Sequence, residues 1–304
     1  MQSTTEMTPT ETLIENAERQ RRLLRRAAWA GVAFVAVSIL IVVGHPLYVR
    51  WQLRQHGWVL NTSMRGGLPD WVPQWAEPWF AKICTAQLAG KPLHVSDLES
   101  LRRFSDLAKV DFDSTDVSAQ SLAVLSQFPD LSSVVFLGVQ IDATGLRHLA
   151  THRKLESIEF LDVYLDDSAL EILATFHRLG ALDVTDVTDE NLRHLSRLHR
   201  LTHLGLWKSH VTDDGATWLT DNCPSLETLS IRGGPMTDVG LAEIARLPHL
   251  NYLQLVDVPI TDDGIRHLMS CSTMTTLVLQ KTKVTSAGVT ELRKSHPSLN
   301  VTIK

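Results

Sequence analysis

The chain has 304 residues, of which 44% are hydrophobic and 21% charged, an ordinary composition for one large or two small globular domains. Its net charge of -5 at pH 7, with no concentration of Lys or Arg in the later segments, argues against a nucleic-acid partner. Three cysteines, Cys84, Cys223 and Cys271, are too few and too scattered for a disulfide framework or a CxxC metal site. They do not reveal the redox compartment.

Residues 1–26 are predicted to form a disordered cytoplasmic tail with an Arg-rich end. The first 18 residues are polar and carry no apolar period long enough to bury. The end of the tail holds five arginines: Arg19, Arg21, Arg22, Arg25 and Arg26.

Residues 27–49 are predicted to form a transmembrane helix. Residues 27–44, AAWAGVAFVAVSILIVVG, contain no charge, and a helix of about 20 such residues spans a bilayer core. The alternatives are a buried core helix and a cleaved signal peptide, but no small-residue cleavage site follows Gly44. Five arginines precede the span and three follow soon after it, so the positive-inside rule predicts a single-pass signal anchor with a cytoplasmic N-terminus and an extracytoplasmic C-terminal part.

Residues 50–82 are predicted to be a Trp-rich linker and N-terminal cap. Five of the eight tryptophans lie here: Trp51, Trp58, Trp71, Trp75 and Trp79. One interpretation is an aromatic belt at the membrane interface, which we favour for Trp51 beside the span. The other is a cap over the open end of a repeat array, which we favour for the last three tryptophans.

Residues 83–304 are predicted to contain nine repeats and a terminal strand. With a period near 24, apolar residues recur at positions 0, 3, 5, 10, 15 and 18 of each repeat, for example Leu250, Leu253, Leu255, Ile260, Ile265 and Leu268. Repeats 1 to 9 begin at residues 83, 107, 131, 155, 179, 201, 226, 250 and 274, and the repeat at 179 lacks two residues in its strand-to-helix turn. Positions 3 and 5 have strand periodicity and positions 15 and 18 helical periodicity, which predicts a stacked solenoid of strand, turn and helix.

The repeats resemble a known family. The pattern in LNYLQLVDVPI and LTHLGLWKSHV resembles a leucine-rich repeat, and the TDxGL continuation with NCPSLETLSI at 222 resembles the cysteine-containing class known from F-box substrate receptors. The whole layout resembles bacterial membrane-anchored proteins with one span and 24-residue repeats. The resemblance implies an α/β fold, a leucine-rich repeat solenoid with a parallel sheet on its concave face, preceded by one transmembrane helix. However, position 8 lacks the expected Asn or Cys, and no F-box-like segment precedes the repeats.

The recurring TDDG-like motif is interpreted as a helix start. Thr212, Thr237, Thr261 and Thr285 are typical N-cap residues, and the following aspartates suit the positive end of the helix dipole. The following glycine is expected to let neighbouring helices stack closely. Calcium binding is disfavoured because one copy per repeat cannot converge on a single ion. His148, His194 and His267 lie in non-adjacent repeats, so no metal or cofactor is expected.

The outward residues of the strands are the candidate binding site. The early repeats supply acidic residues: Asp111, Asp113, Glu159 and Asp183. The later repeats supply aromatic and basic ones: His203, Trp207, Lys208, Arg232 and Tyr252. Because Trp, Tyr and Arg dominate interface hot spots, we expect a membrane-tethered, non-enzymatic module that binds a protein or peptide, with no small-molecule substrate. The alternatives are an architectural protein of the cell envelope and, less favoured, a hydrolase using Asp111, Glu159 or Asp183 as a carboxylate pair.

Overall fold

The structure is a computed structural model that describes residues 59–63, 82–89, 93–102 and 106–303. The chain divides into two units, residues 1–55 and 56–304, and all described residues belong to the second. The predicted tail, membrane span and tryptophans of the linker lie outside the described residues. Within the described ranges, no helix is long and apolar enough to cross a membrane.

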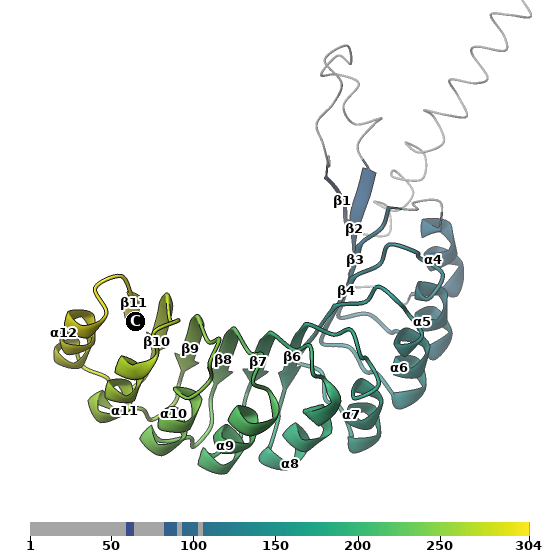
Figure 1. Ribbon diagram of the computed structural model, residues 1–304. Helices are drawn as coiled ribbons and strands as arrows, with labels where there is room; N and C mark the ends of the chain where they lie inside the picture. Colours follow the sequence, from purple (N-terminus) through teal and green to yellow (C-terminus); the bar gives the residue numbers. More distant parts are fainter. Residues whose placement is uncertain (1–58, 64–81, 90–92, 103–105, 304) are drawn as a thin grey trace, which may run out of the picture. The chain divides into compact units, whose positions relative to one another are not determined.

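One sheet runs through the second unit, with its strands side by side in chain order (Figure 1). The first strand pairs antiparallel with the second, and every later neighbour is parallel. The strands are β1 Val59–Ser63, β2 Lys82–Ala89, β3 Lys109–Asp113, β4 Ser133–Leu137, β5 Ser157–Leu161, β6 Ala181–Thr185, β7 His203–Trp207, β8 Thr228–Arg232, β9 Tyr252–Val256, β10 Thr276–Gln280 and β11 Asn300–Ile303.

A helix follows each strand from β2 to β10 and returns the chain to the start of the next strand. The helices lie on the opposite side of the repeats from the open face of the sheet (Figure 1). They are α4 Val95–Leu101, α5 Ala119–Leu125, α6 Ala143–Ala150, α7 Asp167–Leu173, α8 Asp189–Leu192 with the 3-10 helix η3 Arg193–Arg197, α9 Asp213–Asn222, α10 Asp238–Ile244, α11 Asp262–His267 with η4 Leu268–Ser270, and α12 Ser286–Ser295.

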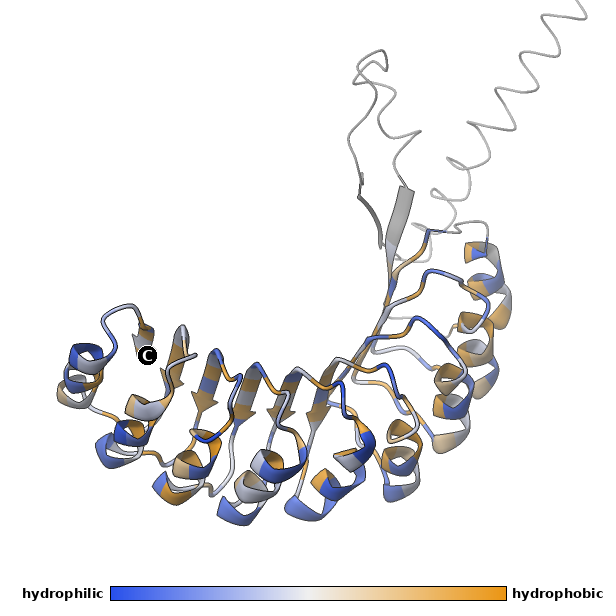
Figure 2. Cartoon of the chain, in the orientation of Figure 1, coloured by the Kyte–Doolittle hydropathy of each residue, from blue (hydrophilic) through white to orange (hydrophobic). Residues whose placement is uncertain are grey.

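The core lies between the sheet and the helices, at the positions that the apolar period predicts. In repeat 8 all six predicted core residues, from Leu250 to Leu268, are at most 1% exposed. Apolar and hydrophilic stretches alternate within the strands and helices (Figure 2), as expected when each element buries one side. The strand-turn-helix solenoid with a parallel sheet is therefore confirmed.

Aromatic rings join the early repeats inside this core. Phe112, Phe136 and Phe160 occupy the same position on β3, β4 and β5 and are directly paired in register. Their rings stack with centroids 5.3 and 5.4 Å apart and nearly parallel planes. All three side chains are fully buried. Stacked rings of this kind add attraction beyond the burial of their area, so they tie repeats 2, 3 and 4 together.

The predicted N-caps are confirmed. In repeats 2 to 9 a Ser, Thr or Asp side chain accepts a hydrogen bond from the backbone at the helix start: Ser118, Asp142, Asp166, Thr188, Thr212, Thr237, Thr261 and Thr285. This satisfies one of the amide groups that each helix start leaves without an intrahelical partner.

The first aspartate of the motif makes a contact that the helix-dipole interpretation did not include. The Asp238 carboxylate accepts hydrogen bonds from the Thr261 amide at 2.8 Å and from the Thr261 hydroxyl at 2.5 Å. Thr261 begins the helix of the next repeat, so the bonds connect successive repeats. Equivalent pairs join Asp189 to Thr212, Asp213 to Thr237 and Asp262 to Thr285. We call these four pairs the Asp–Thr ladder.

The role of the motif glycine also differs from the expected close packing of helices. A Cβ atom on Gly264 would lie 2.2 Å from Oδ1 of Asp238, the ladder carboxylate of the preceding repeat. The same holds for Gly215, Gly240 and Gly288, each facing the preceding ladder aspartate at 2.1 to 2.5 Å. Glycine therefore leaves room for a carboxylate; at Gly240 the Met236 side chain is equally near, and at the earlier Gly145 the nearest atom belongs to Leu122.

The shortened repeat 5 differs from its neighbours in its strand pairing and in its helix. Pairing between β5 and β6 ends at Glu159 and Asp183, after three residues. Beyond these residues the Thr185 side chain joins the two strands. Its hydroxyl donates to the Phe160 carbonyl at 2.8 Å and accepts from the Asp162 amide at 3.2 Å. On the other side, α8 has only four residues before the chain tightens into η3.

Candidate functional site

Three of the predicted acidic residues share one row across the open face of the sheet. The register places Asp111, Val135, Glu159, Asp183 and Gly205 opposite one another on β3 to β7. Adjacent strands are about 4.8 Å apart, so side chains in this row meet. The three carboxylates are each half-buried. The structure therefore brings Asp111, Glu159 and Asp183 onto one surface.

Lys109 lies among these carboxylates and offsets part of their charge. Its ammonium is 3.6 Å from Oδ1 of Asp111 and 3.8 Å from Oε1 of Glu159. Since Glu159 is on β5, the lysine side chain reaches across β4. Gln87 on β2 donates to the other oxygen of Asp111 at 3.4 Å. The early part of the face is thus a mixed-charge cluster with an acidic excess, rather than the purely acidic strip that the sequence suggested.

Asp183 occupies the space that Gly205 leaves open. A Cβ atom on Gly205 would lie 2.1 Å from Oδ1 of Asp183 and 3.2 Å from the indole nitrogen of Trp207. The carboxylate therefore leans over β7, toward the indole N–H. The contact does not reach hydrogen-bond geometry, and Nε1 of Trp207 stays buried without a partner.

Arg232 covers the ring of Trp207 from the next strand. Its guanidinium carbon is 3.9 Å from the ring centroid, a cation–π arrangement. The guanidinium makes no ion pair with any residue that the structure describes. Trp207, Asp183 and Arg232 together form the centre of the face, which we call the Trp207 cluster.

All of the buried side-chain polar atoms found without a hydrogen-bond partner among the described residues lie on this face. They are Nε1 of Trp207, Nε of Arg232 and Oδ1 of Asp111, which has only the 3.6 Å ion pair with Lys109. A buried polar atom without a partner costs about 1 to 3 kcal/mol, so such atoms are uncommon in parts of a protein that serve stability alone. Their concentration on one face distinguishes it from the rest of the described structure.

Burial raises the pKa of two carboxylates on the face, Glu159 and Asp183. Burial raises the pKa of Glu159, Lys109 partly offsets this, and the negative charges of Asp183 and Asp111 raise it further. Burial also raises the pKa of Asp183, while the Trp207 side chain, Arg232, the Gly205 amide and His203 act in the opposite direction. Burial therefore disfavours the charged form of both carboxylates.

The remaining predicted residues lie nearer the edges of the face. Tyr252 is half-buried at the start of β9, and His203 is exposed at the start of β7. Asp113 is exposed at the end of β3, where it accepts from the Ser114 hydroxyl at 2.9 Å. His203 and Tyr252 lie on β7 and β9, near the Trp207 cluster, whereas Asp113 on β3 is four strands away from β7.

Lys208 lies just beyond β7, in the turn and not on the strand. Its backbone has a positive φ of 47°, and the equivalent residue of repeats 2 to 9 is likewise left-handed. Its ammonium pairs with Asp162, two repeats earlier, at 2.5 Å, which raises the lysine pKa. The neighbouring turn residue Asp186 pairs with His210 at 2.9 Å. The turns beyond the strands thus carry ion pairs, and Asp162 partly neutralises the charge of Lys208.

Lys109 and Gly205 were missed by sequence reasoning. Both stand at outward strand positions, so aligning the repeats and reading every residue of each row would have identified them. The sequence prediction named acidic residues in the early repeats and aromatic and basic residues in the later ones, so it left out the lysine and the glycine. The stacking of Arg232 on Trp207 has no signal in the sequence, because it depends on side-chain direction.

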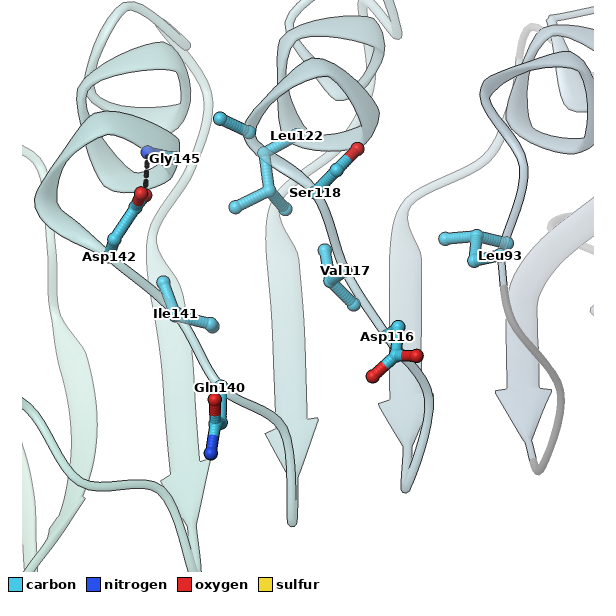
Figure 3. A pocket seen from close by; sticks show the side chains of 10 residues that line it. Leu93, Asp116, Val117, Ser118, Leu122, Gln140, Ile141, Asp142 and Gly145 are labelled. Atoms are coloured by element: carbon cyan, nitrogen blue, oxygen red, sulfur yellow. Dashed lines mark hydrogen bonds between the residues drawn. The ribbon is translucent and has the colours of Figure 1, made fainter.

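Cavities lined by described residues lie away from the open face. One of about 540 Å³ opens between the helix starts of repeats 2 and 3 (Figure 3). Its lining includes Ala119, at the position where the later repeats carry a ladder aspartate, and Asp142, which caps α6 through the Gly145 amide at 2.8 Å. Ala119 offers no carboxylate that could cross this space to the start of α6.

The two described cysteine side chains and the described histidines lie apart from one another. Cys223 and Cys271 are buried and free, and burial raises the pKa of the Cys223 thiol to about 11. Within the described residues, no group of three or more His, Cys, Asp or Glu side chains is placed to hold a metal ion. Cys84 lies in β2, and its side chain is not among those described.

Comparison with known proteins supports the fold. The family model described as "Leucine Rich repeat" matches residues 222–245, from the end of α9 through β8 and α10. The same strand and helix order recurs from β2 to β10 in one parallel sheet. The chain forms a leucine-rich repeat solenoid. A search of curated proteins finds no match to this sequence.

Solved structures of leucine-rich repeat proteins are similar at low identity. Internalin C2 from Listeria monocytogenes is 22% identical with a TM-score of 0.47, and the match covers 70% of this chain and 84% of that one. The internalin inlF from the same organism is 18% identical with a TM-score of 0.48, over 71% of this chain and 60% of that one. Likenesses at this level say nothing about what this leucine-rich repeat chain binds.

Proposed function

We propose that the protein is a membrane-tethered, non-enzymatic interaction module that binds a protein or peptide on the open, concave face of its sheet. The leucine-rich repeat fold fits an interaction module. The observation that supports the location is the group of three buried polar atoms without a hydrogen-bond partner, on Asp111, Trp207 and Arg232. A partner that supplies the missing hydrogen bonds regains free energy that the isolated chain forgoes.

The Trp207 cluster has the composition of an interface hot spot. Trp and Arg are the residues that most often dominate binding energy, and truncating such a residue typically costs 2 kcal/mol or more. Here the guanidinium of Arg232 stacks on the indole ring, and the Asp183 carboxylate lies near the indole nitrogen. A side chain fixed in this way loses little freedom when a partner docks.

The test is selection of random displayed peptides on the full chain, solubilised in a neutral detergent. We expect enriched peptides that bind wild type and lose about 30-fold or more in affinity for Trp207→Ala, the change that a 2 kcal/mol loss implies. Trp218→Ala is the matched control, because Trp218 is a half-buried tryptophan on α9, on the helical side. Equal loss in both variants, or no enrichment at all, would count against the proposal, and the second result would favour an architectural role.

Membrane attachment and sidedness rest on residues 27–49 and on the arginines around them. We propose a cytoplasmic N-terminus and extracytoplasmic repeats. Protease admitted outside an intact inner membrane should digest residues 83–304. If those residues survive while a control protein on that side is cleaved, the proposed orientation is wrong.

Hydrolysis by a carboxylate pair is not proposed. Such a pair needs a site that excludes water and separates the roles of acid and base. Glu159 and Asp183 instead lie on the open sheet, and Lys109 contacts Glu159 and Asp111 together.

A further inference from the structure

A second candidate site lies on the helical side of the molecule, between repeats 4 and 5. A cavity of about 480 Å³ separates the end of α7 from η3, within the size range of small-ligand pockets. Its lining combines acidic, apolar, basic and hydroxyl side chains: Glu171, Ile172, Ala174, Arg193, His194, Ser196 and Arg197. None of these residues belongs to the face described above.

The cavity follows from the shortened repeat. A 3-10 helix is narrower than an α-helix, so it fills less of the space beside its neighbour. The only other 3-10 segment among the described helices, η4, also borders a cavity, of about 350 Å³, between repeats 7 and 8. The lining of this second cavity has a single arginine, Arg246, which can be compared with the two arginines of the first cavity.

The arginines of the two cavities differ in their partners. Arg246 pairs with Glu243 one turn before it. Arg193 and Arg197 are exposed, and the guanidinium group of neither makes an ion pair or hydrogen bond with another residue of the described ranges. Cations near a helix end stabilise the helix dipole, which accounts for their presence in a final turn. It does not account for two unpaired guanidinium groups that line the same cavity.

The chemistry of the lining defines the ligand class. Guanidinium groups match phosphate oxygens in a bidentate geometry, which favours arginine over lysine at phosphate sites. The Ser196 hydroxyl is a further donor, and the Glu171 carboxylate can only accept when ionised, which suits a ligand hydroxyl. Ile172 and Ala174 offer apolar contact for a short carbon chain.

We propose that the cavity between α7 and η3 binds a polyol phosphate, with Arg193 and Arg197 on the phosphate and Glu171 on a hydroxyl. The ligand has two possible sources, a free sugar or glycerol phosphate and the headgroup of a glycerol phospholipid. Binding of either ligand is a function separate from the concave face. The sequence had predicted no small-molecule substrate.

The test is calorimetric titration of the full chain in a neutral detergent with glycerol 3-phosphate. We expect saturable binding that is weakened about tenfold or more by Arg193→Gln and by Arg197→Gln, because each loses a charge-assisted contact. Arg246→Gln in the comparison cavity should bind like wild type, and glycerol without phosphate should not bind. Failure of glycerol 3-phosphate to saturate, or unchanged binding by both variants, would overturn the proposal.

Two further measurements complete the test. If the lipid headgroup is the natural ligand, phosphatidylglycerol added to the micelles displaces glycerol 3-phosphate, and the control lipid phosphatidylcholine does not. If phosphatidylglycerol does not displace it, the free phosphate ester is the natural ligand. Glu171→Gln should retain inorganic phosphate binding and weaken glycerol 3-phosphate, and equal effects on both ligands would remove Glu171 from the site.

Discussion

The early and late repeats share one fold but are joined by different contacts. Repeats 2, 3 and 4 stack three phenylalanine rings in the core, and repeats 2 and 3 carry Ala119 and Ala143 at the ladder position, whereas Asp167 of repeat 4 contacts Asn191 and not a threonine. Repeats 5 to 9 have aliphatic residues in the core and the Asp–Thr ladder at the helix starts. Apolar stacking does not depend on pH, whereas the ladder includes Asp262, whose pKa is lowered by hydrogen bonds from Thr285. Two parts of one solenoid should therefore respond differently to mutation and to acid.

The candidate binding face spans the boundary between these two regions. Glu159 belongs to the last repeat with a stacked ring, and Asp183 to the first repeat whose aspartate enters the ladder. Strand pairing stops early at these two residues. The unpaired polar atoms of the face extend into both regions, from Asp111 to Arg232.

The largest expected effect is on the ring stack. Phe136→Ala removes the middle ring and should destabilise the early repeats by about 3 to 5 kcal/mol. Hydrogen exchange should show lost protection in repeats 2 to 4 and retained protection in repeats 6 to 9, because repeats contact only their neighbours. Uniform loss along the chain would mean that the two regions do not behave separately.

The ladder should be the next most sensitive element. Asp238→Ala leaves the Thr261 amide and hydroxyl without their acceptor and should cost about 1 to 3 kcal/mol in urea unfolding. Asp263→Ala is the control, because Asp263 also lies in the first turn but pairs only with exposed Arg266, a contact worth about 0 to 1 kcal/mol. Equal costs would show that the dipole, and not the ladder, explains the aspartates.

A double-mutant cycle tests the glycine. Gly264→Ala should destabilise wild type, since the new methyl overlaps the Asp238 carboxylate, despite a helix preference of about 1 kcal/mol for Ala. In the Asp238→Ala background the overlap with the carboxylate is gone and the closest remaining atom is Cγ2 of Ile260 at 3.0 Å, so the same change should be less destabilising than in wild type. Additive effects within about 0.5 kcal/mol would contradict the contact.

The smallest effect is the opposite pH response of two aspartates. Hydrogen bonds from Thr285 lower the pKa of Asp262, so its contribution is present above the unfolded pKa of about 3.9 and is lost as the pH falls through the folded value. Asp262→Asn should flatten this acid limb of the unfolding midpoint against pH.

Asp183 has a raised pKa, so its contribution is largest below about pH 3.9 and falls as the pH rises through the folded value. Asp183→Asn should therefore be as stable as wild type or slightly more stable at pH 7. A loss of stability there would show that the ionised carboxylate supports the fold itself.

The sequence determined the stack and its register. Apolar positions such as Leu253, Leu255 and Ile265 recur with strand and helix spacing, and only a shared core buries them in every repeat. Thr261 and its equivalents marked the helix starts, because local capping needs no distant partner. Outward strand positions followed from the same period, which is why Trp207 and Asp183 were predicted to share a face.

Tertiary structure alone decided which of those residues touch. The ladder joins residues 23 or 24 apart, and Arg232 reaches the Trp207 ring from a neighbouring strand. Lys109 crosses a strand to Glu159, and Gly205 admits a carboxylate from the preceding repeat. Periodicity fixes the strand and side on which a residue lies, but side-chain direction, burial and the width of a helical turn depend on neighbours that sequence distance does not specify.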